Sequence, residues 1–284
     1  MKIIECPRDA MQGIHDFIPT EVKANYINEL LQVGFDTIDF GSFVSPKAIP
    51  QMKDTGDVLK ALKLDSTSTK LLAIIANTRG AEDAVQFEEI NYLGFPFSIS
   101  ETFQLRNTNK SIVEALNTLD KVQSLCVKHD KKLVSYISMG FGNPYDDPYS
   151  VDVVAKFTDI LASMGIEIIS LADTIGVSNE ENITYLYENL IKQYPKVEFG
   201  AHLHSNPATA IEKISAAYAA GCRRFDGAIN GYGGCPMAKD ELVGNIATET
   251  IISYFENKNL ELGIDSEKLA QSMKTASAIF TRYS

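Results

Sequence analysis

The sequence lacks the features that would direct the chain to a membrane or to nucleic acid. It contains no run of about 18 or more uninterrupted apolar residues, so a membrane span is not expected. Positive charge is scarce, because 26 Lys and Arg residues face 37 Asp and Glu residues and leave a formal net charge of -11. A polyanionic partner would be repelled by this balance, which argues against general binding to nucleic acid or to anionic membrane.

Paired cysteines, nucleotide-binding loops and a leader segment are also missing. The four cysteines show no CxxC spacing, which argues against a zinc knuckle or a disulfide scaffold. No GxGxxG or GxxxxGK[ST] turn follows the first strand-like run, which disfavours a doubly wound nucleotide-binding sheet. The run beginning at Met1 enters that strand directly and leaves no room for a secretory or transit peptide, so we expect a cytoplasmic protein.

Short β-rich runs alternate with longer helical patterns along the whole chain. This order is typical of parallel βαβ units, and 284 residues is within the usual length of one (β/α)8 barrel. Several of the runs are almost uniformly apolar, as strands buried on both faces should be. The eight expected strands are Lys2 to Glu5, Thr37 to Phe40, Lys70 to Ala76, Glu89 to Leu93, Lys132 to Ile137, Glu167 to Leu171, Val197 to His202, and Arg224 to Ala228.

Helix start and stop signals separate these runs. Thr20 is expected to cap a helix that runs to Gln32, and Ser178 is expected to begin one that stops before Pro195. Residues from about 258 onward are expected to form an added helical segment outside the barrel. No linker or repeat marks a boundary, so residues 1–284 are predicted to form a single TIM-barrel catalytic domain.

Polar residues just after the strands are the first candidates for chemistry, because barrel active sites lie at the carboxyl ends of the strands. His202 and His204 close the seventh strand, and their spacing places both imidazoles on one face, where they could share a metal ion. Taken alone, they could equally be barrel-mouth histidines that bond to backbone groups. Asp9, after the first strand, could add a carboxylate, although Arg8-Asp9 could also be a turn salt bridge.

Two further segments near the last strand add candidates. Asn245 could supply an amide oxygen, although such a residue is more often a helix residue or cap. Mixed nitrogen and oxygen ligands with open positions suit Mg or Mn better than a closed structural zinc site. Cys235 follows a glycine-rich run and could be catalytic or an inert turn residue, whereas Cys6, Cys126 and Cys222 are structural candidates.

Together these segments resemble the 3-hydroxy-3-methylglutaryl-CoA lyase family, within the DRE-TIM metallolyase superfamily. The resemblance spans almost the whole chain. The Arg-Asp pair and the HxH alone would indicate the wider superfamily of aldolases and acyl-CoA condensing enzymes, whereas the cysteine loop and SFVSPK point to the lyase branch. The matching segments are ECPRDAMQ at 5–12, SFVSPK at 42–47, PQM at 50–52, SLADTIG at 170–176, HLH at 202–204, GGCP at 233–236 and GNIATE at 244–249.

The resemblance implies an activity and a set of residue roles. The activity is cleavage of 3-hydroxy-3-methylglutaryl-CoA to acetyl-CoA and acetoacetate with a divalent cation, Mg or Mn, as in leucine degradation. The implied metal ligands are Asp9, His202, His204 and Asn245. Arg8 and Cys235 are further catalytic residues, and either His202 or Asp9 is the general base. Gln12, Asp39, Asp173 and Glu249 have supporting roles.

Some positions depart from the family pattern, and they leave rate and acyl selectivity open. Asp39 stands where the family usually has Glu, Ser205 where it usually has Asp, and Ala10 where glycine is common; Gly142-Asn143-Pro144-Tyr145 replaces a common Gly-Cys-Pro-Tyr. The alternatives are a related aldolase or Claisen-type acyl-CoA enzyme, which Cys235 disfavours, and a non-catalytic acyl-CoA- or metal-binding regulator. An acyl-CoA partner is expected, and a homodimer is left open. Arg79, Arg106 and Lys110 could face the CoA tail or be ordinary surface charges.

Overall fold

A closed barrel of eight parallel strands forms the centre of the molecule. The computed structural model describes residues 1–234 and 243–284. The strands are β1 (Lys2–Glu5), β2 (Thr37–Ser42), β3 (Lys70–Ile74), β4 (Ile90–Ser98), β5 (Lys132–Ser138), β6 (Ile168–Asp173), β7 (Glu198–Leu203) and β8 (Arg224–Gly227). Each strand pairs with its sequence neighbours, and β8 pairs with β1 to close the ring. The (β/α)8 barrel expected from the alternating pattern is confirmed.

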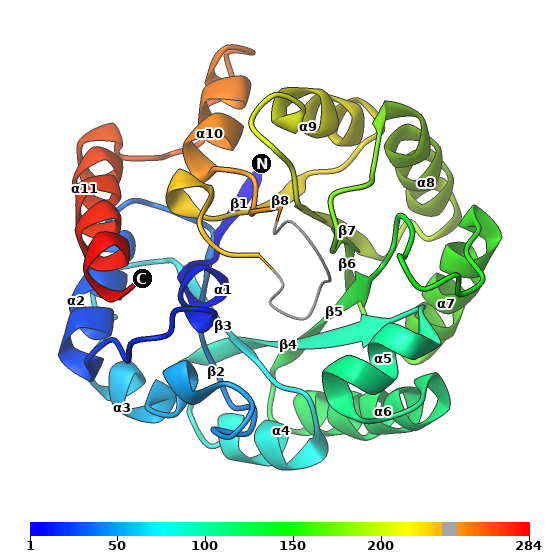
Figure 1. The fold of residues 1–284 in the computed structure, drawn as a ribbon, viewed down its shortest axis with the longest axis horizontal. Helices are drawn as coiled ribbons and strands as arrows, with labels where there is room; N and C mark the ends of the chain where they lie inside the picture. The colour runs from blue at the N-terminus through cyan, green and yellow to red at the C-terminus, as the bar shows by residue number, and fades with distance from the viewer. Residues whose placement is uncertain (235–242) are drawn as a thin grey trace.

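Helices surround the strands on the outside of the ring (Figure 1). The α-helices are α1 (Pro7–Gln12), α2 (Thr20–Leu30), α3 (Thr55–Lys60), α4 (Thr78–Ala84), α5 (Glu101–Thr108), α6 (Ile112–Lys128), α7 (Val151–Ser163), α8 (Glu180–Gln193), α9 (Ala210–Ala219), α10 (Thr248–Glu256) and α11 (Ser266–Tyr283). Short 3-10 turns occupy η1 (Pro50–Met52) and η2 (Ile229–Gly231). The short α1 follows β1 directly and lies inside the ring of longer helices (Figure 1).

Two groups of buried apolar side chains follow from the alternation of the strands. The larger group packs between the strands and the helices, whereas a smaller one lies inside the barrel. The inner group consists of Leu72, Ile74, Tyr92, Val134, Tyr136 and Ile168. All of its members come from β3 to β6, whereas Ile4 of β1 is a buried apolar residue outside both groups.

The fourth strand extends five residues beyond its predicted end at Leu93 and stops at Ser98. Gly94 and Pro96 looked like the end of a strand because both are rare in strand interiors. However, β4 pairs with β3 only as far as Gly94, while its pairing with β5 continues through Pro96 to Ser98. The missing N–H of Pro96 therefore faces the side where pairing has already ended, and the strand continues without losing a hydrogen bond.

Both predicted helix starts are off by a residue or two. The helix α2 begins at Thr20 but ends at Leu30 rather than Gln32, and Pro19 occupies its N-cap without a side-chain cap bond. The helix α8 begins at Glu180, and its cap is Asn179 rather than Ser178. Ser178 instead donates its hydroxyl to the Asp173 carboxylate, which lies 2.5 Å away. The Thr20 hydroxyl likewise donates to Asp54. Neither hydroxyl therefore caps its helix, because each is bonded to a carboxylate instead.

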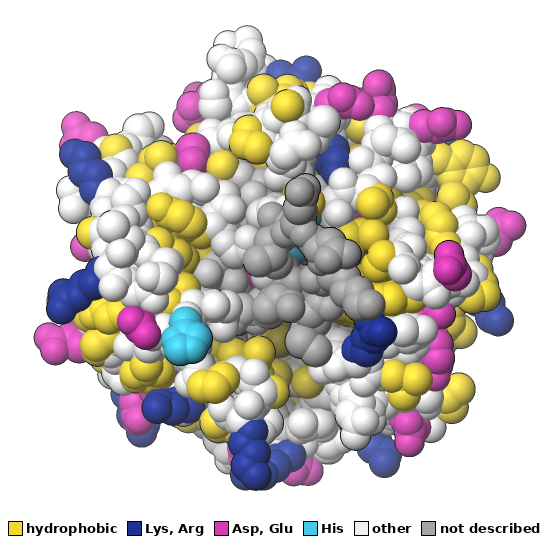
Figure 2. Space-filling model, viewed as in Figure 1, with side chains coloured by type: hydrophobic (Ala, Val, Ile, Leu, Met, Phe, Trp, Pro, Cys, Tyr) yellow, Lys and Arg dark blue, Asp and Glu magenta, His cyan; other side chains and the backbone are white. Residues whose placement is uncertain are grey.

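The expected helical segment after about residue 258 is α11, which packs against α2 and η2. Its Phe280 ring stacks on Tyr232 at a centroid distance of 4.1 Å. None of the described helices is long and apolar enough to cross a membrane. On the face shown in Figure 2, acidic and basic side chains are interspersed, so the excess negative charge is not gathered into one patch there.

Candidate active site

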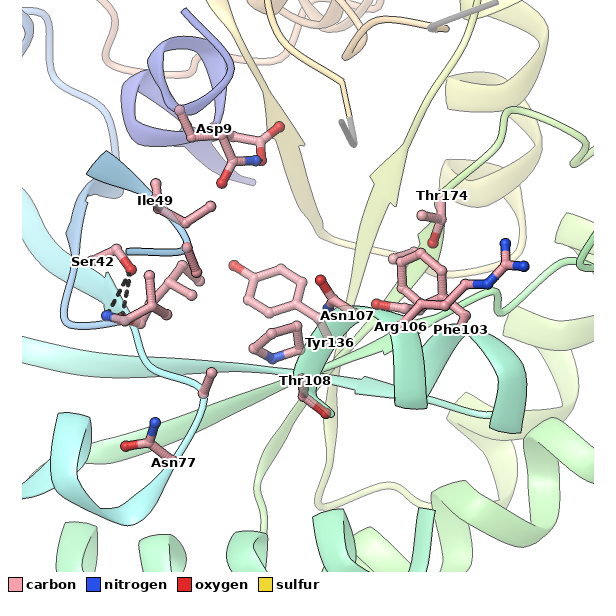
Figure 3. A pocket seen from close by; sticks show the side chains of 18 of the residues that line it. Asp9, Ser42, Ile49, Asn77, Phe103, Arg106, Asn107, Thr108, Tyr136 and Thr174 are labelled. Atoms are coloured by element: carbon pink, nitrogen blue, oxygen red, sulfur yellow. Dashed lines mark hydrogen bonds between the residues drawn. The ribbon is translucent and has the colours of Figure 1, made fainter. Parts of the chain in front are cut away.

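A cavity of about 430 Å³ opens at the carboxyl end of the barrel and is lined by side chains at or after the ends of seven strands, β1 to β7. Figure 3 shows Tyr136 near its centre, with Asp9 on one side and Arg106 on the other. Buried charged and imidazole groups come from the residues after β1 and from β7. The walls from β3 to β6 present mainly apolar, hydroxyl and amide groups, with the exposed Arg106 and the half-buried Lys110 after β4. The position matches the expectation that the residues following the strands form the site.

Arg8 is held in place by the Asp39 carboxylate. Its Nε lies 3.2 and 3.0 Å from the two oxygens of Asp39, and its Nη2 lies 2.5 Å from Oδ2. Both side chains are buried, so the pair is forked and shielded from water. The shorter Asp39 therefore still reaches Arg8 in the place where the family usually has Glu. Burial raises the pKa of Asp39 to about 6, although Arg8 favours its ionised form.

Asp9 is surrounded by donors. Its Oδ1 accepts from Arg8 Nη1 at 2.9 Å and from Gln12 Nε2 at 2.8 Å, and its Oδ2 accepts from Asn245 Nδ2 at 2.6 Å. Burial opposes ionisation of this carboxyl, but the charge of Arg8, the two histidines and the Asn245 bond together lower its pKa to about 2. Asp9 is therefore an anionic ligand at neutral pH and a weak proton acceptor.

His202 and His204 point into the same space from β7 and the residue that follows it. Their ring centroids are 5.3 Å apart. His202 Nδ1 lies 3.1 Å from Asp226 Oδ2, whereas both ring nitrogens of the buried His204 have no partner among the described residues. Burial, followed by the nearby His202, lowers the pKa of His204 to about 4, so this imidazole is neutral at neutral pH.

These groups fit a divalent cation. Asp9, His202 and His204 each offer one ligand atom, and the three atoms lie within 4.8 Å of one another. An orphaned buried imidazole is costly unless something binds it, and a cation bound by His204 would satisfy it. Asn245 forms an isolated bridge with His204, and its amide nitrogen already donates to Asp9 and Tyr232, which leaves its oxygen as the available ligand atom. Carboxylate, imidazole and amide ligands suit a hard or borderline divalent ion.

The other predicted supporting residues lie around this group without facing it directly. The Asp173 carboxylate accepts the backbone N–H groups of Val177 and Ser178 at 2.8 and 3.0 Å and the Lys213 Nζ at 2.8 Å. Glu249 accepts the backbone N–H of Asn230. Both carboxylates therefore order the loops after β6 and β8. Cys235 lies outside the described residues.

The departures from the family pattern have local partners. The hydroxyl of Ser205 bonds to the Asn206 carbonyl and to the Thr209 hydroxyl, both at 2.8 Å, so it closes the turn after β7. Asn143 accepts from the backbone N–H groups of Tyr145 and Asp147 and donates to the Asp147 carbonyl, which stabilises its own turn. Neither residue lines the cavity in the described part of the chain.

Three basic side chains, those of Arg79, Arg106 and Lys110, were candidates for contact with a CoA tail, and they differ in position. Arg106 and Lys110 line the cavity, and Arg106 lies over the Tyr145 ring, 4.7 Å from its centroid. Arg79 is not among the described lining residues; its side chain is 90% exposed, and its nearest carboxylate partner is 4.0 Å away. Cys6, Cys126 and Cys222 are buried free thiols, as expected of structural cysteines.

Sequence reasoning missed Asp226 and Lys213. Asp226 has a weak signal, since it is a charged residue at an inward-facing position of a barrel strand. Lys213 has none, because helices carry many lysines. Its Nζ is nevertheless buried and donates to Asp173, to the Gly176 carbonyl and to the His204 carbonyl. This lysine therefore ties the end of β7 to the loop that follows β6.

Comparison with known proteins gives one consistent family. The model of the family described as HMGL-like matches residues 2–275. The hydroxymethylglutaryl-CoA lyase YngG of Bacillus subtilis is 34% identical over 268 residues, which cover 94% of this chain and 89% of that protein. The cytoplasmic 3-hydroxy-3-methylglutaryl-CoA lyase of Rattus norvegicus is 32% identical over 275 residues, or 96% of this chain and 79% of the relative.

A solved structure agrees with these relatives over the full barrel. An HMG-CoA lyase from Acinetobacter baumannii, in complex with coenzyme A and 3-methylmalate, superposes with a TM-score of 0.91 at 29% identity. The match covers 99% of this chain and 91% of that one. The carboxyl transferase domain of Rhizobium etli pyruvate carboxylase has a TM-score of 0.74 at 13% identity, a likeness that concerns the fold alone.

Proposed function

The chain belongs to the HMGL-like family, and from that premise we propose that it is a divalent-cation-dependent lyase that cleaves 3-hydroxy-3-methylglutaryl-CoA to acetyl-CoA and acetoacetate. The observation that carries the proposal is the buried imidazole of His204, which has no partner among the described residues and lies beside Asp9 and His202 in the cavity that Arg8 also lines. Cleavage of the C2–C3 bond needs removal of a hydroxyl proton and stabilisation of a thioester enolate.

Asp9, His204 and Asn245 would hold the cation, and His202 would be the fourth ligand through Nε2 whenever that nitrogen is not accepting a proton. A divalent cation held there would acidify the substrate's tertiary hydroxyl and help to orient it. Arg8 lines the cavity with its guanidinium fixed by Asp39 and Asp9, so it presents positive charge to a developing enolate oxygen without having to reorganise. The chain's own fixed charges thus serve the carbon–carbon cleavage.

His202 is the better candidate for the general base. Asp9 has a pKa of about 2, and both of its oxygens already accept hydrogen bonds. For His202, burial lowers the pKa, but the bond to Asp226 and the charges of Asp226 and Asp9 outweigh burial and raise it. A group with a higher pKa accepts a proton from a hydroxyl more readily than a group with a low pKa does. The proposal therefore assigns the role of general base to His202 rather than to Asp9.

Cys235 is proposed as the proton donor that converts the enolate to acetyl-CoA. This role rests on the resemblance of the GGCP segment, because the residue lies outside the described part of the chain. Replacing Cys235 by Ser keeps the size but raises the donor pKa by several units. We expect a fall in kcat of roughly 100-fold, with cation affinity unchanged, and near-normal kcat would remove Cys235 from the mechanism.

The acyl-CoA partner of the proposed reaction fits the shape of the cavity. Ile74, Ala76 and Pro96 offer an apolar wall for the acyl group, and Arg106 and Lys110 offer positive charge at the rim for the CoA phosphates. The solved relative from Acinetobacter baumannii contains coenzyme A, which supports the same partner class here. Mg or Mn as the cation, a homodimeric assembly and a cytoplasmic location remain predictions from the sequence.

One assay tests the function directly. Purified protein is incubated with Mg²⁺ or Mn²⁺ and with a panel of branched 3-hydroxyacyl-CoAs, and both products are identified by mass. Acetyl-CoA and acetoacetate in equal amounts from 3-hydroxy-3-methylglutaryl-CoA are the expected result, and removal of the cation by a chelator should abolish them. Cation-loaded, folded protein that binds the thioester without cleaving it would instead support the non-catalytic regulator.

A further inference from the structure

The imidazole of His202 has a second partner besides the proposed cation site. Its Nδ1 lies 3.1 Å from Oδ2 of Asp226, whose side chain is only 1% exposed. The register between β7 and β8 pairs Gly200 with Arg224, so His202 and Asp226, each two residues further on, face each other across the ladder. The contact is therefore built into the strand pairing and does not depend on a loop.

The chemistry of this contact fixes the proton on one nitrogen. A carboxylate only accepts hydrogen bonds, so Nδ1 must carry the proton and Nε2 must carry the free lone pair. Tyr136 packs edge-on against the His202 ring at a centroid distance of 5.5 Å, and the His204 ring lies 5.3 Å away. These neighbours restrict rotation of the ring, so exchange of the two nitrogens by a flip is hindered.

A neighbouring thiol offers no better explanation of the Asp226 contact. Cys6, His202 and Asp226 also each offer one ligand atom within 4.8 Å of the others, so they could be considered a separate cation site. However, burial raises the pKa of the Cys6 thiol well above its usual range, and its Sγ donates to the Ile4 carbonyl at 3.8 Å. A protonated thiol is a poor ligand, which leaves the Asp226–His202 hydrogen bond as the reason for the cluster.

A second buried charged residue lies on the same strand as Asp226. Arg224 lies two residues earlier and therefore on the same inward face of β8, and it is fully buried. The Arg224 guanidinium bonds to Glu198 at 3.4 Å, so the hydrogen bond that the Asp226 carboxylate makes among the described residues is the one to His202. The arrangement parallels the other inner carboxylate of the site, Asp39, which is buried behind Arg8 and fixes its orientation.

We propose that Asp226 is a positioning residue of the active site, which holds His202 with Nδ1 protonated and Nε2 offered to the cation and substrate. This inference rests on the proposed function, in which His202 is a cation ligand or the general base. In either role His202 would use its Nε2 atom. Carboxylates that bond to the second nitrogen of a metal-binding histidine typically contribute 10–100-fold to metal affinity or activity.

The tautomer can be measured without any activity assay. The chain has only four histidines, so the ¹⁵N spectra of histidine-labelled protein are simple, and a His15→Gln, His129→Gln background leaves only His202 and His204. Mg²⁺-loaded protein is observed at a pH above the raised pKa of His202. We expect one of the two imidazoles to carry its proton on Nδ1, and Asp226→Asn to redistribute that proton while Mn²⁺ affinity falls roughly 10–100-fold.

Glu198→Gln is the matched control. Glu198 is another barrel carboxylate near Arg224, at 3.4 Å, but it lies at the opposite end of β7 from His202. The control therefore removes a charge from the surroundings of Arg224 without touching the imidazole, and tautomer and Mn²⁺ affinity should both stay as in the unaltered chain. An equal effect of both variants would mean that Asp226 acts only through the folding of the barrel interior.

Two results would overturn the assignment. A proton on Nε2 of His202 in the unaltered protein would do so even if Asp226→Asn failed to fold, and so would a folded Asp226→Asn variant with the same tautomer and affinity. The proposed function fails separately, because the tautomer and the Mn²⁺ affinity are read without a thioester. Protein that shows the expected spectra but cleaves no 3-hydroxyacyl-CoA would keep Asp226 as a positioning residue of a different cation site.

Discussion

The two halves of the barrel mouth differ sharply in chemistry. The half built on β8, β1, β2 and β7 holds the buried ionic and imidazole groups. The half built on β3 to β6 presents mainly aliphatic, aromatic, hydroxyl and amide groups, with Arg106 and Lys110 at its rim. Even Asp173 at the end of β6 turns into its own loop and bonds with Lys213. In the proposed function, the division would separate the groups that act on the substrate's bonds from the surface that receives the acyl chain.

The charged half is stable because each buried charge has a partner. Asp39 pairs with Arg8, Asp9 with Arg8 and Asn245, and Asp226 with His202. An unpaired buried charge costs several kcal/mol, whereas a paired and hydrogen-bonded one can be retained. His204, which lacks a partner among the described residues, is neutral. The buried charged groups thus lie on one side of the barrel mouth. Substitutions on the β3 to β6 side would therefore alter the fit of the acyl group without removing a buried charge.

The strongest test of this division is removal of the guanidinium from the charged half. We expect Arg8→Gln to lower kcat by roughly 1000-fold, because a fixed donor to a developing oxyanion contributes on this scale. Arg106→Gln makes the same substitution at the rim of the neutral half and should change mainly KM. Steady-state kinetics with 3-hydroxy-3-methylglutaryl-CoA at saturating cation measure both. Similar losses of kcat in the two variants would show that the two halves share the chemistry.

The pH profile should belong to the charged half alone. Asp39 has its pKa raised to about 6, and that of His202 is also raised, so both groups take up protons as the pH falls through this region. Protonated Asp39 releases Arg8, and protonated His202 can neither bind a cation nor accept a proton. We therefore expect kcat/KM at saturating cation to fall as the pH drops below about 6, with a slope that steepens from about tenfold toward about a hundredfold per pH unit once both groups take up protons. A profile that is flat to lower pH would mean that these groups titrate below their assigned range.

A change in the neutral half should alter selectivity and leave the chemistry intact. Ala76→Leu adds a branched side chain to the cavity wall after β3. Loss of fit in an apolar pocket costs roughly 1–3 kcal/mol, so KM should rise about tenfold or more while cation affinity and the acid limb of the pH profile stay unchanged. Assays with shorter and longer 3-hydroxyacyl-CoAs would show whether the preference shifts to smaller groups. An altered cation affinity would contradict the separation of the two halves.

The charged half was also the part that the sequence revealed best. His202, His204, Asp9 and Asn245 follow strands, and the structure brings them together because the carboxyl ends of all strands meet at one end of the barrel. Asp226 could not be predicted as a site residue because its partner, His202, lies on the neighbouring strand β7. The register between two strands cannot be read from one sequence. The neutral half was predicted less well, since β4 continues through Gly94 and Pro96 only because its neighbour ends there.

Glu5 offers a final contrast with the carboxylates of the charged half. It lies on β1, the strand that leads to Arg8, but faces the outer layer and is fully buried. Its partners are the Thr248 hydroxyl at 2.5 Å and the Ile229 N–H at 3.0 Å, and neither carries a charge. Burial raises the pKa of Glu5 to about 8 despite these two bonds. A buried carboxyl without a cation therefore stays protonated where its counterparts in the site stay ionised.

Glu5→Gln should make thermal stability less dependent on pH. Between about pH 4.5 and pH 8, the unfolded chain has lost the Glu5 proton and the folded chain retains it, so stability falls as pH rises through this window. Gln removes this titration, and the difference in Tm between the variant and the unaltered chain should therefore grow by about 8 °C from the lower to the upper end. Circular dichroism melts at several pH values measure it, with the exposed Asp57→Asn as control. A constant difference would mean that Glu5 ionises in its ordinary range, and that burial alone does not separate it from the carboxylates of the charged half.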